Sequence, residues 1–394
     1  ALRYASEELR ADREVVLAAV QRWRTDQPWA PADGVLRFAS GELRADPAIL
    51  RAAASPSLGS GPLYYRGGQF IPGGGGRAPK GSGDKEEEEE DIVKVGRFEV
   101  NLDRLLGSGG FAQVFRAVDR TTSPPLYVAA KRGGAEELRK EAQMLELVAG
   151  HPAIIGLHGF VESPDPGEAF LFLEMCSGGE LFERVSDGGQ LSERAARPIA
   201  KGIAEALRHC LSRGVVHRNV GLENVMLSAE DPSALKLIDF GLACTVPLAP
   251  DGSLKPVLLY DCVGSTSYMA PELFFASAGY HAPPVDCWAY GVLVFSLLAG
   301  FFPFEEAKAS DWRYAKLAQS VANGVGPCDA IFRMYNRSCP FSPAAREFCD
   351  ALLVIEANKR ATIEQCLEQP WLSSPVQALT EVEEKVRREE GRRP

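Results

Sequence analysis

The chain has 394 residues, of which 45% are hydrophobic and 24% charged, and its formal net charge is −10. This length allows two or three domains, and the apolar content is typical of a packed core rather than a disordered chain. Proteins that bind nucleic acid or anionic membranes usually carry a basic balance. The acidic charge therefore argues against both kinds of partner.

The cysteine pattern bears on the compartment. Nine cysteines lie between Cys176 and Cys366, and no two of them form a Cys-x-x-Cys pair. An odd number of cysteines in a large chain is typical of reduced thiols in a cytosol-like compartment. The sequence begins with Ala1 and shows no basic-then-apolar leader. We therefore expect a cytoplasmic or nuclear protein whose N-terminus is incomplete.

The N-terminal segment contains a repeat, because the pattern of residues 1–20 recurs at residues 35–54, an offset of 34 residues. A period of this length is typical of stacked helical units. Asp12 in the first copy and Asp46 before Pro47 in the second are helix-start signals. The pattern resembles an uncharacterised tandem repeat of some protist proteins. We expect two helical copies that either bind another protein or form a passive appendage.

The composition changes after the repeats. Glycine-rich runs at residues 73–76 and 81–83 are typical of a flexible linker, and residues 86–91 form an acidic run that stays solvated. From Gly96 onward the pattern is that of a globular domain. The predicted division is a helical repeat segment at 1–54, a Gly-rich and acidic linker at 55–95, a globular domain at 96–372 and a charged tail at 373–394.

The order of the apolar patterns predicts the fold class of the globular domain. Short β-like runs reach to about Glu174, and long helical runs follow to about Leu372. A small β-rich lobe followed by a larger helical lobe is an α+β arrangement. The longest apolar run, Cys287 to Phe304, reaches the length of a membrane helix, but glycine, serine and proline interrupt it. We therefore predict no membrane span.

A glycine-rich stretch opens the globular domain. Residues 107–114 read GSGGFAQV and follow a strand-like run that ends at Leu106. Glycines at such a turn let backbone N–H groups approach a phosphate without a Cβ in the way. The next strand-like run ends in Lys131, and a helix-like run at about residues 135–148 offers Glu141. This order and spacing favour a phosphate-binding site.

Two further motifs carry chemistry. Residues 215–224 read VVHRNVGLEN, and the triplet Asp239-Phe240-Gly241 follows after a spacing short enough for a hairpin. Such a hairpin would bring Asn224 and Asp239 to one site. Amide and carboxylate oxygens are ligands that Mg²⁺ prefers.

These motifs, in this order, resemble the protein kinase family over about residues 97–372. The sequences Gly178-Gly179-Glu180-Leu181 and Pro370-Trp371-Leu372 are most similar to the calcium/calmodulin-dependent branch of the Ser/Thr kinases. The resemblance implies a bilobal kinase fold and assigns the long apolar run to a buried helix. It also implies that Glu272 pairs with an arginine late in the domain, and Arg360 fits.

The resemblance implies ATP and Mg²⁺ as cofactors. Lys131 would hold the phosphates and pair with Glu141, and Asn224 and Asp239 would bind the metal. Leu173 would lie beside the adenine, backbone groups of Glu174 and Cys176 would bind its edge, and Glu180 would lie near the ribose or the substrate. Ala112 stands where the family has a third glycine. The implied nucleotide-binding residues are Leu106, Gly107, Ser108, Gly109, Gly110, Ala112, Val114, Ala129, Lys131, Leu173, Glu174, Cys176, Glu180 and Met226.

The catalytic loop departs from the family pattern at two positions. Asn219 stands where the family has the aspartate that takes the proton of the substrate hydroxyl, and Gly221 stands where Ser/Thr kinases have lysine. An amide is no base near pH 7, and loss of such a group typically costs about 10²–10⁴ in rate. Gly221 also removes a charge that would stabilise the transferring phosphoryl group.

These departures leave three functional hypotheses. The leading one is a pseudokinase or very weak kinase that binds ATP and Mg²⁺ and acts as a signalling scaffold or as an allosteric partner of another kinase. The alternative is an active Ser/Thr kinase that transfers the γ-phosphate of ATP to protein hydroxyls. The third is a structural scaffold with an empty cleft. Expected partners are ATP and a protein substrate or regulated kinase, without nucleic acid.

Regulation by phosphorylation is a further hypothesis. The stretch from Asp239 to Glu272 contains several hydroxyl side chains, and Arg218 could receive a phosphate there. The candidate hydroxyls are those of Ser253, Tyr260, Ser265, Thr266 and Ser267.

Overall fold

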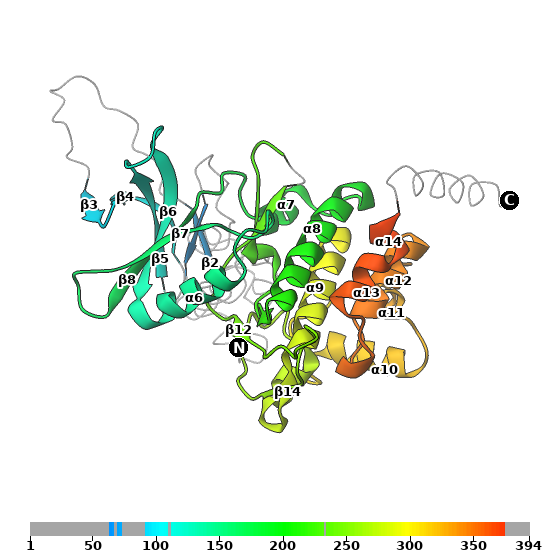
Figure 1. The fold of residues 1–394 in the computed structure, drawn as a ribbon. Coiled ribbons are helices and arrows are strands. Elements are labelled where there is room, and N and C mark those ends of the chain that lie inside the picture. The colour runs from blue at the N-terminus through cyan, green and yellow to red at the C-terminus, as the bar shows by residue number, and fades with distance from the viewer. Residues whose placement is uncertain (1–62, 67–68, 73–90, 109–111, 232–233, 375–394) are drawn as a thin grey trace, which may run out of the picture. The chain divides into compact units, whose positions relative to one another are not determined.

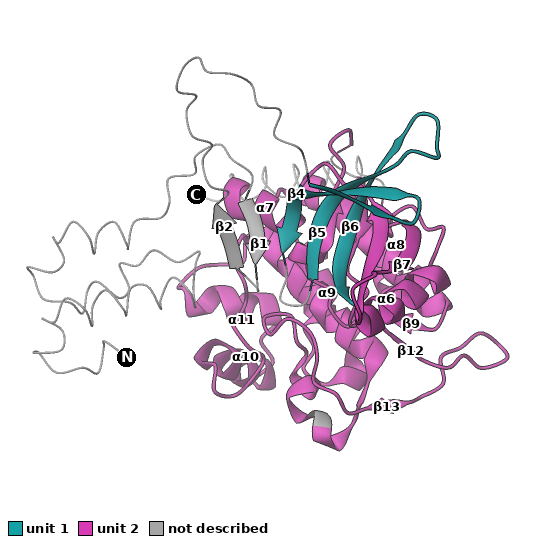
Figure 2. Ribbon diagram, turned by 90° about the vertical axis from the view of Figure 1, so that its left-hand side faces the viewer, with its two compact units in different colours: residues 1–134 teal, residues 135–394 magenta. Residues whose placement is uncertain are grey.

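The computed structural model describes residues 63–66, 69–72, 91–108, 112–231 and 234–374 (Figure 1). Contacts divide the chain into two compact units, residues 1–134 and 135–394, and each is described by itself (Figure 2). The repeats predicted at 1–54 and nearly all of the tail predicted at 373–394 lie outside the described residues.

Unit 1 is built from antiparallel strands. A separate hairpin pairs its first two strands, and the next four pair in chain order, each with its successor. The strands are β1 (Leu63–Arg66), β2 (Gln69–Pro72), β3 (Ile92–Val95), β4 (Phe98–Ser108), β5 (Ala112–Asp119) and β6 (Leu126–Gly134).

The burial of unit 1 alternates along these strands. Phe115 and Ala117 on β5, and Val128 and Ala130 on β6, are all buried. Because successive side chains of a strand point to opposite faces, the residues between them line the other face of the sheet. The buried face forms the core, and the opposite face carries the candidate site described below.

The structure differs from the predicted linker at its C-terminal end. Ile92–Val95 was placed in the linker, but these residues form β3 and pair with β4 in register, Val95 opposite Phe98. The segment is rich in β-branched residues, and Val95 is buried in the core of unit 1. The neighbouring acidic and glycine-rich composition hid this short strand. The hairpin β1–β2 also falls within the predicted linker.

Unit 2 opens with a helix and an antiparallel strand pair and is otherwise largely helical. Its α-helices and its longer strands are α6 (Ala135–Leu147), β7 (Leu157–Glu162), β8 (Glu168–Glu174), α7 (Leu181–Gly188), α8 (Glu193–Ser212), α9 (Ala282–Ala299), α10 (Trp312–Ala322), α11 (Pro327–Met334), α12 (Pro343–Leu352), α13 (Ile363–Glu368) and α14 (Pro370–Ser373). Three short 3₁₀ helices are η2 (Leu222–Asn224), η3 (Pro271–Ala278) and η4 (Ala357–Lys359).

Short strands of unit 2 shape its loops. They are β9 (Val215–Val216), β10 (Val225–Leu227), β11 (Leu235–Leu237), β12 (Cys244–Thr245), β13 (Leu258–Leu259) and β14 (Tyr280–His281). They pair β9 with β12, β10 with β11 and β13 with β14, all antiparallel. The β10–β11 pair is the hairpin expected between Asn224 and Asp239.

The core of unit 2 lies around α8 and α9, which run side by side (Figure 1). Ser192 caps α8 by accepting the Ala195 N–H, and the Tyr290 hydroxyl on α9 donates to the Ala200 carbonyl on α8 at 2.8 Å. Within the described residues, α9 alone is long and apolar enough to cross a membrane, but 89% of it is buried inside the unit. The prediction that the long apolar run contains a buried helix is confirmed.

The late arginine is found where the sequence predicted it. The Arg360 guanidinium is buried and donates to both carboxylate oxygens of Glu272, at 2.7 and 3.1 Å. Paired geometry of this kind fixes both groups in direction as well as distance. All nine cysteines, which lie within the described part of the chain, are free thiols. The fold class is α+β, as predicted.

Candidate nucleotide and catalytic site

The candidate nucleotide-binding residues of unit 1 form a row across three strands. In the register of the sheet, Gly107 on β4 lies opposite Val114 on β5, which lies opposite Lys131 on β6. Ala129 precedes Lys131 by two residues and shares its face, away from the buried core residues. Four of the implied nucleotide-binding residues therefore lie on one face of one sheet.

The glycine-rich turn borders this row. Leu106 is exposed near the end of β4, Ser108 ends the strand, and Ala112 begins β5. A Cβ added at Gly107 would meet nothing within 4 Å, so open space adjoins this position. Gly109 and Gly110 lie outside the described residues, and their expected role stays a prediction.

The end of β8 carries the residues expected beside the adenine. Leu173 is buried, and the Glu174 N–H donates to the Gly156 carbonyl at 2.8 Å. The Glu174 carboxylate accepts from the Gly156 N–H at 3.0 Å and pairs with Lys236 at 2.8 Å. Burial and the charge of Glu174 raise the pKa of Cys176 to about 11, so this thiol is neutral. The strand end is thus fixed within unit 2.

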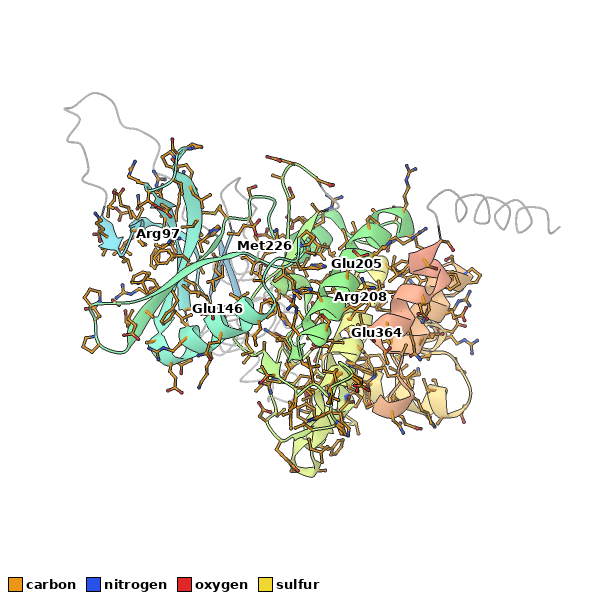
Figure 3. The ribbon with its side chains drawn as sticks, in the orientation of Figure 1. Arg97, Glu146, Glu205, Arg208, Met226 and Glu364 are labelled. Atoms are coloured by element: carbon orange, nitrogen blue, oxygen red, sulfur yellow. The ribbon has the colours of Figure 1, made fainter. Side chains whose placement is uncertain are left out.

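Glu180 and Met226 come together beyond this strand end. They form an isolated antiparallel bridge, and Met226 comes from β10 (Figure 3). The Oε2 atom of Glu180 is buried and has no hydrogen-bond partner among the described residues. Burial, with the charges of Glu183 and Glu223, raises the pKa of Glu180 to about 8. An unpaired buried oxygen of this kind calls for a hydrogen-bonding partner, such as a sugar hydroxyl.

Asp286 of α9 holds the catalytic loop, residues 215–224, by two hydrogen bonds. Its two carboxylate oxygens accept the backbone N–H groups of His217 and Arg218, at 2.8 and 2.7 Å. Arg218 has a φ of 62°, a left-handed conformation that costs a non-glycine residue energy. Burial raises the pKa of Asp286 to about 7. The paired N–H groups stabilise this strained turn.

Asn219 is hydrogen-bonded to the stretch from Asp239 to Glu272, the activation segment. Its side-chain Oδ1 accepts the Ser265 N–H at 3.1 Å and the Ser265 hydroxyl at 3.0 Å. An amide oxygen offers two lone pairs, and these two bonds use both. The remaining polar group of the side chain is an NH₂, which only donates.

Gly221 lies in a space where a larger side chain would force its neighbours to shift. A Cβ at this position would come within 2.9 Å of the Tyr268 ring and 3.0 Å of the Glu223 carboxylate. Tyr268 is buried, and its hydroxyl accepts the Leu222 N–H at 3.0 Å. The φ of Gly221 is −164°, which any residue can adopt, so packing and not backbone strain excludes the side chain.

The expected metal ligands lie at the hairpin β10–β11. The Asn224 carbonyl accepts the Ile238 N–H at 2.9 Å, and its Nδ2 donates to the Asn219 carbonyl at 2.8 Å. The Asn224 Oδ1 is thereby left as the acceptor of that side chain. Asp239 directly follows Ile238 and has a φ of 61°.

Glu141 of α6 belongs to the same region of unit 2. A Cβ added at Gly241 would lie 3.4 Å from an Asp239 carboxylate oxygen and 3.5 Å from one of Glu141. Glu141 is buried, and Phe240 is buried with its ring against His217, the centroids 4.7 Å apart. Three of the predicted site residues, Asn224, Asp239 and Glu141, are thus brought together. The predicted pairing of Lys131 with Glu141 stays a prediction.

The residues present fit ATP and Mg²⁺. Asp239 and Asn224 supply one carboxylate and one amide oxygen, and Mg²⁺ is commonly held by one or two such ligands together with phosphates. Within the described residues no cluster of three or more His, Cys, Asp or Glu could hold a metal by itself. Bound there, the ion would neutralise phosphate charge, and the unpaired Glu180 oxygen could form a hydrogen bond with a ribose hydroxyl.

Three residues of the site were not identified from the sequence as site residues: Asp286, Ser265 and Tyr268. Of the three, the sequence indicated Ser265 alone, as a possible phosphorylation site. Each contacts the catalytic loop from more than 40 residues away along the chain. Contacts between residues so far apart in the chain leave no local pattern in the sequence.

Comparisons with known proteins agree with this geometry. The model of the protein kinase domain matches residues 100–372, and that of a domain of unknown function, DUF4116, matches residues 1–44. Rice CBL-interacting protein kinase 31 is 33% identical over 71% of this chain and 58% of its own length. Calcium-dependent protein kinase 1 of Arabidopsis thaliana is 34% identical over 69% of this chain and 42% of its own length.

A human relative, serine/threonine-protein kinase H2, is 29% identical over 76% of each chain. The chain spans about half the length of the plant relatives described above. With a protein kinase domain matched over most of its residues, the chain belongs to the protein kinase family. Its fold is the α+β kinase fold, with a β-rich N-lobe and a helical C-lobe.

Proposed function

We propose that this chain is a pseudokinase that binds ATP and Mg²⁺ and transfers phosphate very weakly or not at all. The observation that carries the proposal is the engagement of Asn219 by Ser265. An aspartate at this position would have two oxygens, one for Ser265 and one for a substrate hydroxyl. Asn219 has a single oxygen, and Ser265 uses both of its lone pairs.

Gly221 supports the same proposal. The family's lysine at this position supplies a positive charge near the transferring phosphoryl group. Here the Tyr268 ring and the Glu223 carboxylate border the position, and burial raises the pKa of Glu223. The loop therefore lacks a base at Asn219 and a cation at Gly221.

The nucleotide-binding residues support retained binding. In the family, the residues at the positions of Lys131, Asn224 and Asp239 contact nucleotide or metal, and the residue at the position of Glu141 pairs with the lysine; none of them contacts the substrate hydroxyl. Glu180 offers its orphaned oxygen to a hydroxyl donor. Nucleotide binding would order the domain as a signalling scaffold or as an allosteric partner of another kinase. The N-terminal repeats would bind a further protein, and the nine free thiols favour a reducing compartment, cytoplasmic or nuclear.

The test combines binding with phosphoryl transfer. Calorimetric titration of the purified full chain with ATP·Mg²⁺ should show saturable binding, which Asp239→Ala abolishes. Transfer of γ-phosphate to a generic basic protein should be the same for the wild type and for Asp239→Ala. Binding without transfer supports the proposal. No binding would leave a structural scaffold, and transfer above the control would identify an active kinase.

An active Ser/Thr kinase is the second candidate, and one observation favours it. Phe240 is buried against His217, and carboxylate oxygens of Glu141 and Asp239 both lie near Gly241. The triplet Asp239-Phe240-Gly241 therefore packs against the interior of unit 2. In such a kinase, positioning alone would drive the transfer, without a base at Asn219. Its rate would then depend little on pH near neutrality, since no group titrates at the reacting hydroxyl.

A further inference from the structure

Arg218 connects three segments of unit 2. Its backbone N–H is bound by Asp286, and its Nε donates to the Leu242 carbonyl at 2.7 Å, just after the Asp239-Phe240-Gly241 triplet. Its Nη1 donates to the Asp261 carboxylate at 2.6 Å. The guanidinium side chain is only 11% exposed. A buried arginine of this kind needs a fixed negative partner, because a lone charge is costly there.

Asp261 is held from a second side by Tyr280. The Tyr280 hydroxyl lies 2.9 Å from the Asp261 carbonyl and 3.3 Å from its Oδ1. Tyr280 belongs to β14, which pairs with β13 just before Asp261 in the chain. Asp261 is therefore fixed by a side chain from the catalytic loop, by a second from β14, and by the strand that precedes it.

We propose that Asp261 is the built-in counterion of Arg218, and that it positions the catalytic loop and the activation segment without phosphorylation. The carboxylate occupies the place on Arg218 that a phosphate would otherwise take. The inference goes beyond the proposed function and holds whether or not the chain transfers phosphate.

The charges around Arg218 argue against a phosphate there. Arg218 carries one positive charge, and Asp261 already neutralises it at hydrogen-bond distance. Burial opposes ionisation of Asp261, but the hydrogen bond and charge of Arg218 lower its pKa, so it is ionised at neutral pH. A phosphate would add nearly two negative charges beside Asp261 and repel it. Two of the candidate phosphorylation sites lie close to Asp261 in the chain. The Ser265 hydroxyl already donates to Asn219, and Tyr260 is 62% exposed.

The test is amide hydrogen exchange of the full chain after phosphatase treatment, without nucleotide. Asp261→Asn keeps the size of the side chain and removes its charge. It should raise exchange in peptides around Leu242 and Asp261 about tenfold, the usual effect of losing a charge-assisted hydrogen bond. Asp261→Glu should restore protection, because it restores the charge. Asp251→Asn is the matched control, since Asp251 lies in the same segment but bonds only to Ser253.

Two results would overturn the proposal. One is exchange in Asp261→Asn equal to that of the wild type or of Asp251→Asn. The other is wild type that exchanges about tenfold faster around Asp261 after phosphatase treatment than before it, because phosphate would then hold the segment. If Asp261→Asn fails to fold, Tyr280→Phe decides, since it removes only the hydroxyl contacts. It should raise exchange at Asp261 more than Asp251→Asn does, and no increase would also overturn the proposal.

Discussion

The two ends of the catalytic loop differ in what they retain. At its C-terminal end, Asn224 flanks the β10–β11 hairpin on one side and Asp239 flanks it on the other, and the two residues keep oxygens that suit a metal. At its centre, Asn219 has its single acceptor occupied and Gly221 has no side chain. Under the proposed function, nucleotide binding and phosphoryl transfer depend on different atoms of this region, so that one function can be lost while the other is kept.

Restoring the base should produce the largest effect. Asn219→Asp adds a second acceptor oxygen, so one oxygen can hold Ser265 while the other receives the substrate proton. Phosphoryl transfer should rise toward the lower end of about 10²–10⁴-fold, because Gly221 still lacks the lysine. The measurement is γ-phosphate incorporation into a generic basic protein. Asn219→Ser, which supplies no carboxylate, is the control. Unchanged transfer would mean that the base is not what limits the wild type.

Changing Asp239, the proposed metal ligand beyond the β10–β11 hairpin, should act on nucleotide binding. Asp239→Asn should weaken ATP affinity in the presence of Mg²⁺ by about 10–100-fold, since a charged contact is worth about 1.5–3 kcal/mol. Calorimetric titration measures the affinity. Asn219→Asp should leave it within about twofold, and a comparable loss in both variants would contradict the separation of the two functions.

Introducing the family's lysine at Gly221 should destabilise the fold. Gly221→Lys places a Cβ within 2.9 Å of the Tyr268 ring, and overpacking of this kind typically costs about 1–3 kcal/mol. The melting temperature should fall in thermal unfolding. Gly188→Lys is the control, because a Cβ there meets nothing within 4 Å. Equal melting temperatures for the two variants would show that Tyr268 moves freely.

The smallest effect should be a change in pH dependence at Glu180. Its pKa is raised from an ordinary 4.5 to about 8, so folding takes up a proton. The stability from this group is full below pH 4.5 and is lost as the pH rises through 8. Glu180→Gln cannot titrate, so its melting temperature should fall less than that of the wild type between pH 5 and 8. Parallel curves would show that Glu180 is ionised in the folded chain.

The sequence predicted the parts of the fold that depend on local patterns. The helix-like run of α6, the long apolar run of α9, the hairpin before Asp239 and the ion pair of Glu272 with Arg360 all follow from pattern or family resemblance. Ile92–Val95 was misassigned because a four-residue strand beside an acidic run gives little signal. A strand this short becomes recognisable only when its partner β4 is known.

The contacts that decide the chemistry of the loop were not predictable from the sequence. From the sequence, Ser265 was only one of several hydroxyl side chains between Asp239 and Glu272, and Asp261 was not singled out. Their bonds to Asn219 and Arg218 depend on how the activation segment folds back over the loop. That path is set by the pairing of β9 with β12 and of β13 with β14, two-residue strands that leave no periodic pattern.

The packing of Tyr268 against Gly221 makes the two departures in this loop unequal as targets for substitution. Asn219 differs from aspartate by one terminal atom, so the aspartate needs no extra room. At Gly221, the Tyr268 ring borders the space that the first carbon of a lysine would need. A lysine there requires Tyr268 to shift or the protein to lose stability. Under the proposed function, phosphoryl transfer is therefore simpler to gain by substitution at Asn219 than at Gly221.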